Sequence, residues 1–168
     1  MAQELKITVR RARARDAEMI AVFINRAQAG QVTVDRVGVI QRLGSVGFLL
    51  AERHGDLLGL LGWQAENLIA RVTDFLVWPT SERIAVSRML LAEMEQAAGE
   101  LQCEAVVLFV PHAEQARTVE FWNAFGYEPR AAADLPKVWQ EAAREAPAGD
   151  VGTVLVKQLR DRRVVRPL

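Results

Sequence analysis

The stretch from Val72 to Leu91 constrains the fold most, because it joins an apolar strand to an amphipathic helix through one short loop. The apolar run ends at Pro79, and proline cannot continue a central strand. From about Arg83 to Gly99 the apolar residues then fall at helical spacing. A helix that begins just after a strand presents unpaired backbone N–H groups and a positive dipole end, which can bind phosphate. On this stretch alone an ordinary strand–loop–helix connection is the favoured interpretation, so the other elements must decide.

The segments before this stretch predict strands and helices in alternation. Asp16 is expected to cap the first helix, and Gly44 to close the second. The turn between the second and third strands is expected at Arg53–Asp56. From period-two and helical patterns we expect strands at Leu5–Arg11, Gly47–Glu52, Asp56–Gln64 and Ile69–Trp78, and helices from Asp16 to Gly30 and over Val34–Leu43.

The second half of the chain predicts further strands and helices. A continuous apolar run at Ala105–Val110 predicts a strand buried on both faces. Helices are expected at Gln115–Phe125, which Gly126 stops, and at Asp134–Ala146; Val151–Leu159 is the last strand. With 168 residues the chain has the size of one domain. We therefore predict a single mixed α/β domain over 1–168, with a helical insertion at about 131–150.

Composition excludes several classes of protein. Hydrophobic residues make up 51% and charged residues 25% of the chain, which excludes a disordered or collagen-like protein. The formal net charge is zero, although Lys6–Arg15 and Lys157–Leu168 are both basic. No aromatic residues are interleaved with these basic ends, so we expect no nucleic-acid partner. No apolar run is long enough for a membrane span, and no signal peptide is evident, so we expect no membrane partner. A single cysteine, Cys103, favours the cytoplasm.

Two motifs resemble those of the GNAT superfamily of acyl-CoA-dependent N-acetyltransferases. The family run V-x-P-x-x-R-G-x-G-I-G-x-x-L-L aligns without a gap to Val77–Leu91, and the run N-x-x-A-x-x-F-Y-x-x-x-G-F aligns to Gln115–Tyr127. Val154–Leu159 is similar to the family's closing strand. The resemblance implies a mostly antiparallel central sheet flanked by helices, with a phosphate site where a strand leads through a loop into a helix.

The resemblance also implies acetyl-CoA as co-substrate. The family's pyrophosphate pattern Q/R-x-x-G-x-G/A places Glu82, Ala85 and Ser87 at its defining positions. Two like charges about 5 Å apart cost roughly 3 kcal/mol at an effective dielectric constant of 20, about a hundredfold in affinity, so Glu82 opposes diphosphate binding. Arg83 and Arg88 offset this charge if they turn inward, or else they are solvated helix residues. The cofactor-binding residues that the resemblance implies are Leu76, Val77, Arg83, Ile84, Ala85, Val86, Ser87, Arg88 and Gln115.

Direct acetyl transfer needs a base for the amine, a donor for the oxyanion and a proton for the departing thiolate. Asp74 is the first candidate base, since a carboxylate in an apolar strand needs either a partner or a function; it is equally well a structural hydrogen-bond acceptor. Glu52 and Glu66 are further candidates. The resemblance places the oxyanion donor at the backbone of Leu76 or Val77.

The family's acidic tyrosine is replaced by Trp122. An indole N–H donates a hydrogen bond but does not give up its proton, and Tyr127, the chain's one tyrosine, is expected to be packed. Water or His112 must then protonate the thiolate. His54 in its turn and Cys103 without a basic neighbour carry no predicted role, and the histidine and cysteine spacings predict no metal site.

Two functions remain open on the sequence. The first is an N-acetyltransferase that moves an acetyl or short acyl group to a small-molecule or peptide amine. The alternative is a catalytically inactive module of the same fold that binds a ligand or a protein partner, because the family residues at Glu82, Ala85 and Trp122 are all replaced. The 131–150 insertion either covers the acceptor site or packs against a second subunit, which would make a homodimer.

Overall fold

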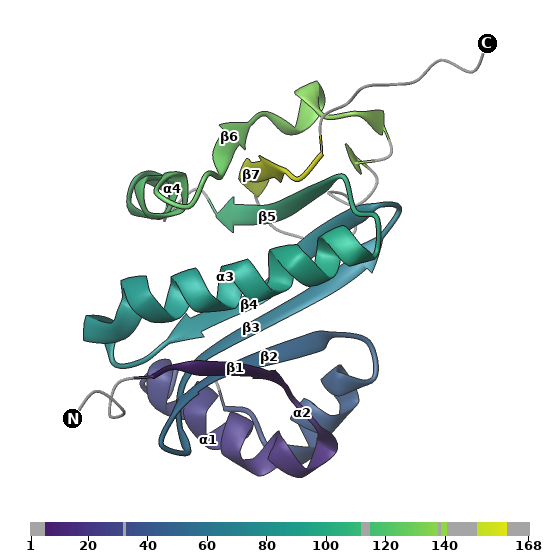
Figure 1. Ribbon diagram of the computed structural model, residues 1–168. Helices are drawn as coiled ribbons and strands as arrows, with labels where there is room; N and C mark the ends of the chain where they lie inside the picture. Colours follow the sequence, from purple (N-terminus) through teal and green to yellow (C-terminus); the bar gives the residue numbers. More distant parts are fainter. Residues whose placement is uncertain (1–5, 32, 112–114, 138, 141–150, 161–168) are drawn as a thin grey trace. The chain divides into compact units, whose positions relative to one another are not determined.

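A seven-stranded sheet runs through the chain in the order β1-β2-β3-β4-β5-β7-β6 (Figure 1). β4 and β5 pair in parallel, through Ile69–Arg71 of β4, whereas the β1–β2, β2–β3, β5–β7 and β6–β7 pairs are antiparallel. The strands are β1 (Thr8–Arg11), β2 (Gly47–Arg53), β3 (Asp56–Glu66), β4 (Ile69–Val77), β5 (Ala105–Pro111), β6 (Glu128–Arg130) and β7 (Val151–Gln158). The helices are α1 (Ala17–Ala27), α2 (Arg36–Leu43), α3 (Arg83–Glu100) and α4 (Gln115–Asn123). The predicted mixed, mostly antiparallel fold with flanking helices is confirmed.

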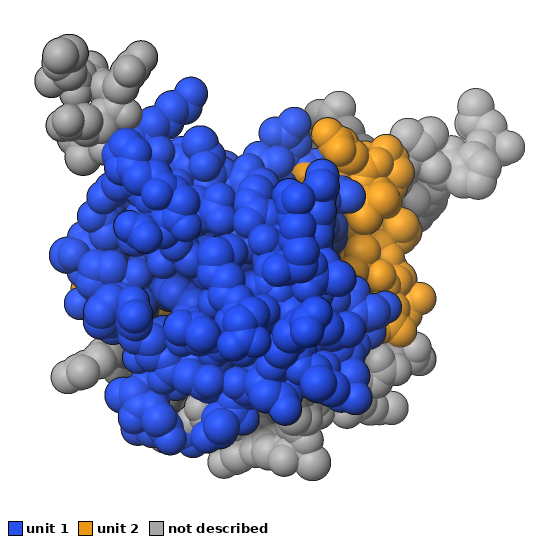
Figure 2. Space-filling view, turned by 90° about the horizontal axis from the view of Figure 1, so that it is seen from below, with its two compact units in different colours: residues 1–64, 72–96 blue, residues 65–71, 97–168 orange. Residues whose placement is uncertain are grey.

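The computed structural model describes residues 6–31, 33–111, 115–137, 139–140 and 151–160. The chain divides into two compact units, one of residues 1–64 and 72–96 and one of residues 65–71 and 97–168 (Figure 2). The strand β4 and the helix α3 each contribute to both units. A single domain over the whole chain stays a prediction.

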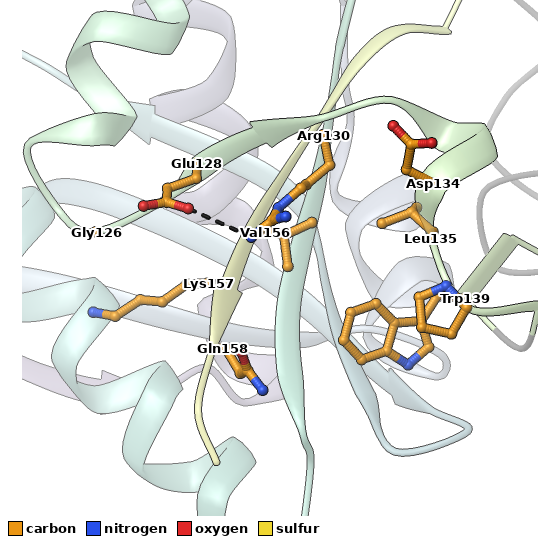
Figure 3. A pocket seen from close by; sticks show the side chains of 10 residues that line it. Gly126, Glu128, Arg130, Asp134, Leu135, Trp139, Val156, Lys157 and Gln158 are labelled. Carbon is orange, nitrogen blue, oxygen red and sulfur yellow. Dashed lines mark hydrogen bonds and ion pairs between the residues drawn. The ribbon is translucent and has the colours of Figure 1, made fainter. Parts of the chain in front are cut away.

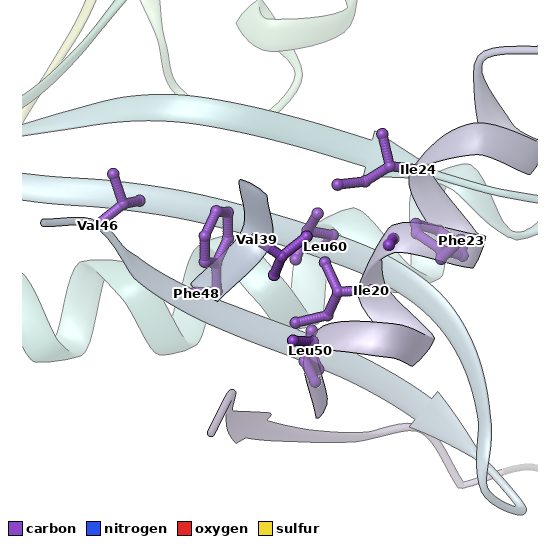
Figure 4. Packing of buried hydrophobic residues seen from close by; sticks show 10 residues of the cluster. Ile20, Phe23, Ile24, Val39, Val46, Phe48, Leu50 and Leu60 are labelled. Carbon is purple, nitrogen blue, oxygen red and sulfur yellow. The ribbon is translucent and has the colours of Figure 1, made fainter. Parts of the chain in front are cut away.

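In the first unit, α1 and α2 pack on one face of β2 and β3. The helical spacing of the apolar residues in α1 places Ile20, Phe23 and Ile24 toward this face. They meet the strand residues Phe48 and Leu50 in one buried cluster (Figure 4). This cluster forms the core beneath the two helices.

Two glycines of β3 allow close packing on opposite faces of the strand. A Cβ atom at Gly59 would collide with Val86 and Leu90 of α3. A Cβ at Gly62 would lie 2.6 Å from Asp74 Oδ2 and 2.8 Å from Phe48 Cε1. Successive residues of a strand face opposite sides of the sheet, so Gly59 and Gly62, which are three positions apart, face opposite sides. The helix α3 therefore lies on the face opposite to α1 and α2.

The second helix starts later than the sequence predicts, and Asp16 is the N-cap residue of the first helix without capping it through its side chain. The second helix begins at Arg36 and not at Val34, because Val34 exchanges two 2.8 Å hydrogen bonds with the Asn25 side chain and stays outside the helix. Asp35 is the N-cap and accepts from the Gly38 N–H at 2.8 Å. Asp16 does precede α1, but its carboxylate accepts from the Arg13 backbone N–H instead of capping that helix.

The carboxylate of Asp16 is instead part of a charged cluster at the edge of the first unit. Arg10 donates two hydrogen bonds of 2.8 Å to Asp16 and two more to Glu52, at 3.0 and 3.1 Å. The hydrogen bonds from Arg10 lower the pKa of Asp16 to about 2. The same carboxylates raise the pKa of Arg10. The cluster ties the start of α1 to β1 and β2.

The second unit has its own core around β5 and β7. Buried Val107, Val154 and Val156 pack with Leu135 and Trp139. The expected helix does not begin at Asp134: a 3-10 turn covers Ala132–Asp134, Pro136 follows it, and helical residues appear from 137. Proline is favoured at a helix start and not within one. Residues 141–150 of the predicted insertion lie outside the described residues.

We expect the Asp16→Asn variant to be less stable than the wild type at pH 7 by about 2 kcal/mol, since one pKa unit corresponds to about 1.4 kcal/mol. The folded pKa of Asp16 is lowered, from 3.8 to about 2. Its contribution is therefore complete above pH 4 and is lost as the pH falls toward 2. Urea unfolding between pH 2 and 7 measures this. Glu18→Gln, which removes an exposed carboxylate from the first turn of α1, is the control and should change stability little. An Asp16→Asn variant with the wild-type pH dependence below pH 4 would contradict the assignment.

We expect Gly62→Ala to destabilise the fold by about 1–3 kcal/mol, because the added methyl group has no room beside Asp74, Phe48 and Thr73. The matched control is Gly47→Ala in β2, where the nearest atom to a new Cβ is 3.6 Å away. Denaturant unfolding of both variants makes the comparison. Equal stability of the two variants would show that the packing over Gly62 is loose.

Candidate functional site

The loop between β4 and α3 forms the predicted phosphate-binding turn. After Pro79 one 3-10 turn, Thr80–Glu82, leads directly into α3. The first turn of this 18-residue helix is open, with the side chains of Arg83, Ile84 and Ala85 exposed. The first N–H groups of a helix have no partner within it and point toward its N-terminus. The side chains of these three residues therefore leave the turn exposed. Within the turn the Glu82 N–H donates to the Pro79 carbonyl oxygen and the Arg83 N–H to that of Thr80, and phosphate binding here stays a prediction.

Glu82 does not carry an uncompensated charge at this turn, contrary to the expectation from the sequence. Arg53, at the end of β2, donates to both carboxylate oxygens of Glu82, at 2.9 and 3.1 Å. The hydrogen bonds that Arg53 donates to Glu82 lower the pKa of Glu82 and raise the pKa of Arg53. The charge that opposes a diphosphate is thus neutralised by a residue that the sequence analysis did not single out.

Two buried polar atoms in this region have no hydrogen-bond partner among the described residues: Arg53 Nε and Ser87 Oγ. Ser87 and Val86 are fully buried in α3, whereas Arg88 is exposed. Buried polar atoms without a partner are rare in folded proteins. An N–H donor on the arginine beside the turn suits an anionic ligand.

A cavity of about 300 Å³ in the first unit is lined by residues of α1, α2, β2 and β4. Four consecutive residues of β4, Thr73–Leu76, border it, so the cavity reaches the strand on which the sequence placed Asp74 and Leu76. Val77, the next residue, ends β4. The other lining residues are Ile24, Gln28, Val34, Val39, Arg42 and Phe48.

Asp74 has two protein partners in this cavity. Arg42 of α2 donates to both of its oxygens, at 2.6 and 2.5 Å, and the Thr73 hydroxyl donates to Oδ2 at 2.8 Å. The guanidinium of Arg42 also lies 5.4 Å from the centre of the Phe48 ring. The carboxylate of Asp74 is therefore held in place, as the structural alternative required. Whether it also acts as a base stays a prediction.

The cavity contains another polar atom without a partner. Gln28 follows the last turn of α1 and lines the cavity. Its Oε1 is buried and accepts no hydrogen bond from any described residue. Gln28, Arg42 and Arg53 were missed because a polar residue on an amphipathic helix or at a strand end has no distinguishing sequence signal.

The other candidate bases do not line this cavity. Glu52 is held by Arg10 in the charged cluster described above. Glu66 is exposed at the end of β3, in the second unit. Cys103 is buried, and this burial raises the pKa of its thiol, which disfavours the thiolate needed for nucleophilic attack. His54 lies in the expected hairpin turn with a φ of 51°.

The structure packs Trp122 in the second unit. Its side chain is 4% exposed, and its ring meets that of Tyr127 edge-on at 5.1 Å between centroids. Tyr127 is fully buried, as the sequence predicted. This environment favours core packing for Trp122, and a catalytic role stays a prediction. His112 lies outside the described residues, and Gln115 is the first residue of α4.

The second unit has a pocket of its own, of about 480 Å³ (Figure 3). Leu135 and Trp139 form its apolar side. Glu128 and Arg130 also line it and form a 3.5 Å ion pair with each other. None of its described lining residues is a predicted catalytic or cofactor-binding residue.

The described residues show neither a group of metal ligands nor a helix suited to a membrane. No group of three or more histidine, cysteine, aspartate or glutamate side chains in the described part of the chain is arranged to hold a metal ion. None of the described helices combines the length and the hydropathy that crossing a membrane requires.

No family profile and no curated protein sequence matches the chain. Solved structures do match it. A GNAT-family acetyltransferase of Staphylococcus aureus Mu50 superposes with a TM-score of 0.69 and 17% identity, over 92% of this chain and 100% of its own. The ribosomal-protein-S18-alanine N-acetyltransferase of Escherichia coli gives 0.71 and 12%, over 97% and 100%. The PaiA N-acetyltransferase of Thermoplasma acidophilum, in complex with coenzyme A, gives 0.66 and 13%, over 92% and 99%. The chain therefore has the fold of the GNAT superfamily of N-acetyltransferases.

Proposed function

We propose that the chain is an acetyl-CoA-dependent N-acyltransferase that moves an acetyl or short acyl group directly to an amine. The observation that carries this proposal is the α3 N-terminus, where the first turn is open and Arg53 neutralises Glu82. A structural neighbour of the same fold is described in complex with coenzyme A, which supports the choice of ligand. The inactive-module alternative loses one of its three supports, since Glu82 no longer excludes a diphosphate.

In this proposal the diphosphate binds at the first turn of α3, beyond the Arg83 N–H that already donates to Thr80. Ala85 is exposed and small, so the ligand can approach the backbone closely. The backbone of Leu76 or Val77 at the end of β4 donates to the thioester oxygen, where negative charge develops during transfer.

The cavity beside Asp74 receives the amine. The amine nitrogen bonds to the thioester carbonyl carbon, the carbon–sulfur bond breaks, and the CoA thiolate leaves. Asp74 accepts a hydrogen bond from the amine and directs it, while water takes the proton that the nitrogen releases. Water also protonates the thiolate, since the indole N–H of Trp122 does not give up its proton.

We expect acetyl-CoA to raise the melting temperature of the protein. A ligand at a hundred times its Kd stabilises the folded state by about 2.7 kcal/mol, which corresponds to a shift of about 5–10 °C for a chain of this length. Thermal unfolding with acetyl-CoA measures this, with dephospho-CoA and desulfo-CoA as comparison ligands that should give smaller shifts. An unchanged melting temperature at millimolar acetyl-CoA would favour the inactive module.

The Arg53→Ala variant should bind acetyl-CoA about 10- to 100-fold more weakly, because Glu82 then faces the diphosphate without its counter-charge. Glu82→Gln alone should change the Kd only a few-fold. The double variant Arg53→Ala/Glu82→Gln should recover most of the lost affinity. Isothermal titration of the three variants forms a complete cycle.

Arg11→Ala is the matched control for this cycle, since it removes one exposed arginine from β1 and should leave the Kd unchanged. Equal losses in Arg53→Ala and in the double variant would show that Arg53 does not act by neutralising Glu82. Unchanged affinity in Arg53→Ala would place the diphosphate elsewhere.

A further inference from the structure

Resting on the proposed function, we propose that the acceptor is a compact primary amine with an apolar body and no carboxylate group. Most of the cavity wall is apolar, and two polar acceptors remain available in it.

The walls select for an apolar and small molecule. Six of the ten lining residues are apolar: Ile24, Val34, Val39, Phe48, Phe75 and Leu76. The volume of about 300 Å³ is at the lower end of the range for small-molecule sites. A short aliphatic or arylalkyl group fills such a space, whereas a peptide or a polyamine brings polar groups that these walls cannot satisfy.

The charges of the lining residues exclude a carboxylate on the acceptor. Arg42 and Asp74 are the only lining residues with a formal charge among those described, and they neutralise each other. Arg42 is engaged by both oxygens of Asp74 and by the Phe48 ring. An amino-acid carboxylate would bring a second negative charge to a pair that is already neutral, which leaves one negative charge without a counter-charge.

The remaining acceptors match the two N–H groups of a neutral primary amine. An ionised carboxylate has about four lone-pair sites. Arg42 and Thr73 use three of them on Asp74, which leaves one on Oδ1. Gln28 also lines the cavity, and its buried Oε1 has no donor among the described residues, so it becomes the second acceptor once the side chain turns toward the amine. If each acceptor takes one N–H, the nitrogen lone pair stays free for attack on the thioester.

The test compares amines with their own α-carboxylated counterparts, by measuring thiol release from acetyl-CoA. Phenethylamine is paired with phenylalanine, and isoamylamine with leucine. We expect kcat/KM to be at least 100-fold higher for the amine of each pair. Comparable rates for the two members, turnover of peptide amines only, or no turnover of either amine by a chain that binds acetyl-CoA would overturn the inference. Absence of acetyl-CoA binding would instead overturn the proposed function.

A variant of Gln28 tests the second acceptor. Gln28→Leu keeps the approximate size of the side chain and removes the oxygen, so KM for the amine should rise about tenfold. The Kd for acetyl-CoA should stay unchanged. Gln41→Leu, on the exposed surface of α2 and outside the cavity, is the matched control and should keep wild-type kinetics. Wild-type KM in Gln28→Leu would overturn the role of Gln28.

Discussion

The absence of two side chains in β3 determines how closely the neighbouring parts of the first unit can approach the sheet. At Gly59 a single added carbon would collide with Val86 and Leu90 of α3, and at Gly62 it would collide with Asp74. Cores at native packing density do not absorb such additions without strain. The position of α3, which carries the proposed phosphate turn, and the position of Asp74, which borders the proposed acceptor cavity, therefore both depend on glycine in one strand.

Pairing of charges across the sheet is the second constraint on this unit. Arg10 binds Asp16 and Glu52, Arg42 binds Asp74, and Arg53 binds Glu82. Arg42 and Arg53 each neutralise one carboxylate that would repel an anion or would be costly to desolvate, whereas Arg10 is shared between two carboxylates. Exposed pairs contribute little to stability, so the larger consequence of the last two pairs is electrostatic. They make the phosphate turn and the cavity close to neutral.

The sequence predicted the elements well, because a strand or a helix is encoded locally by the period of its apolar residues. The Arg53–Asp56 turn and the strand–loop–helix around Pro79 were both predicted correctly. The start of α2 was not, since Asn25 holds Val34 from a distance along the chain. The ion pairs of the site were missed for the same reason: Arg42 and Asp74 are 32 residues apart, and Arg53 and Glu82 are 29 apart. Such pairs follow from strand register and helix docking, which no local pattern encodes.

The departures from the family pattern have different physical consequences, and this difference bears on the function. A buried tryptophan at 122 removes an acid whose proton water can supply, so the loss slows a step without preventing it. A carboxylate at position 82 would weaken binding of the co-substrate itself, and water cannot restore that affinity. Arg53 donates hydrogen bonds from both of its terminal nitrogens to that carboxylate. A protein that binds a diphosphate at α3 needs this compensation, whereas a module without that ligand gains little from it at a half-exposed site. The Arg53–Glu82 pair therefore supports the proposal that the chain binds an acyl-CoA.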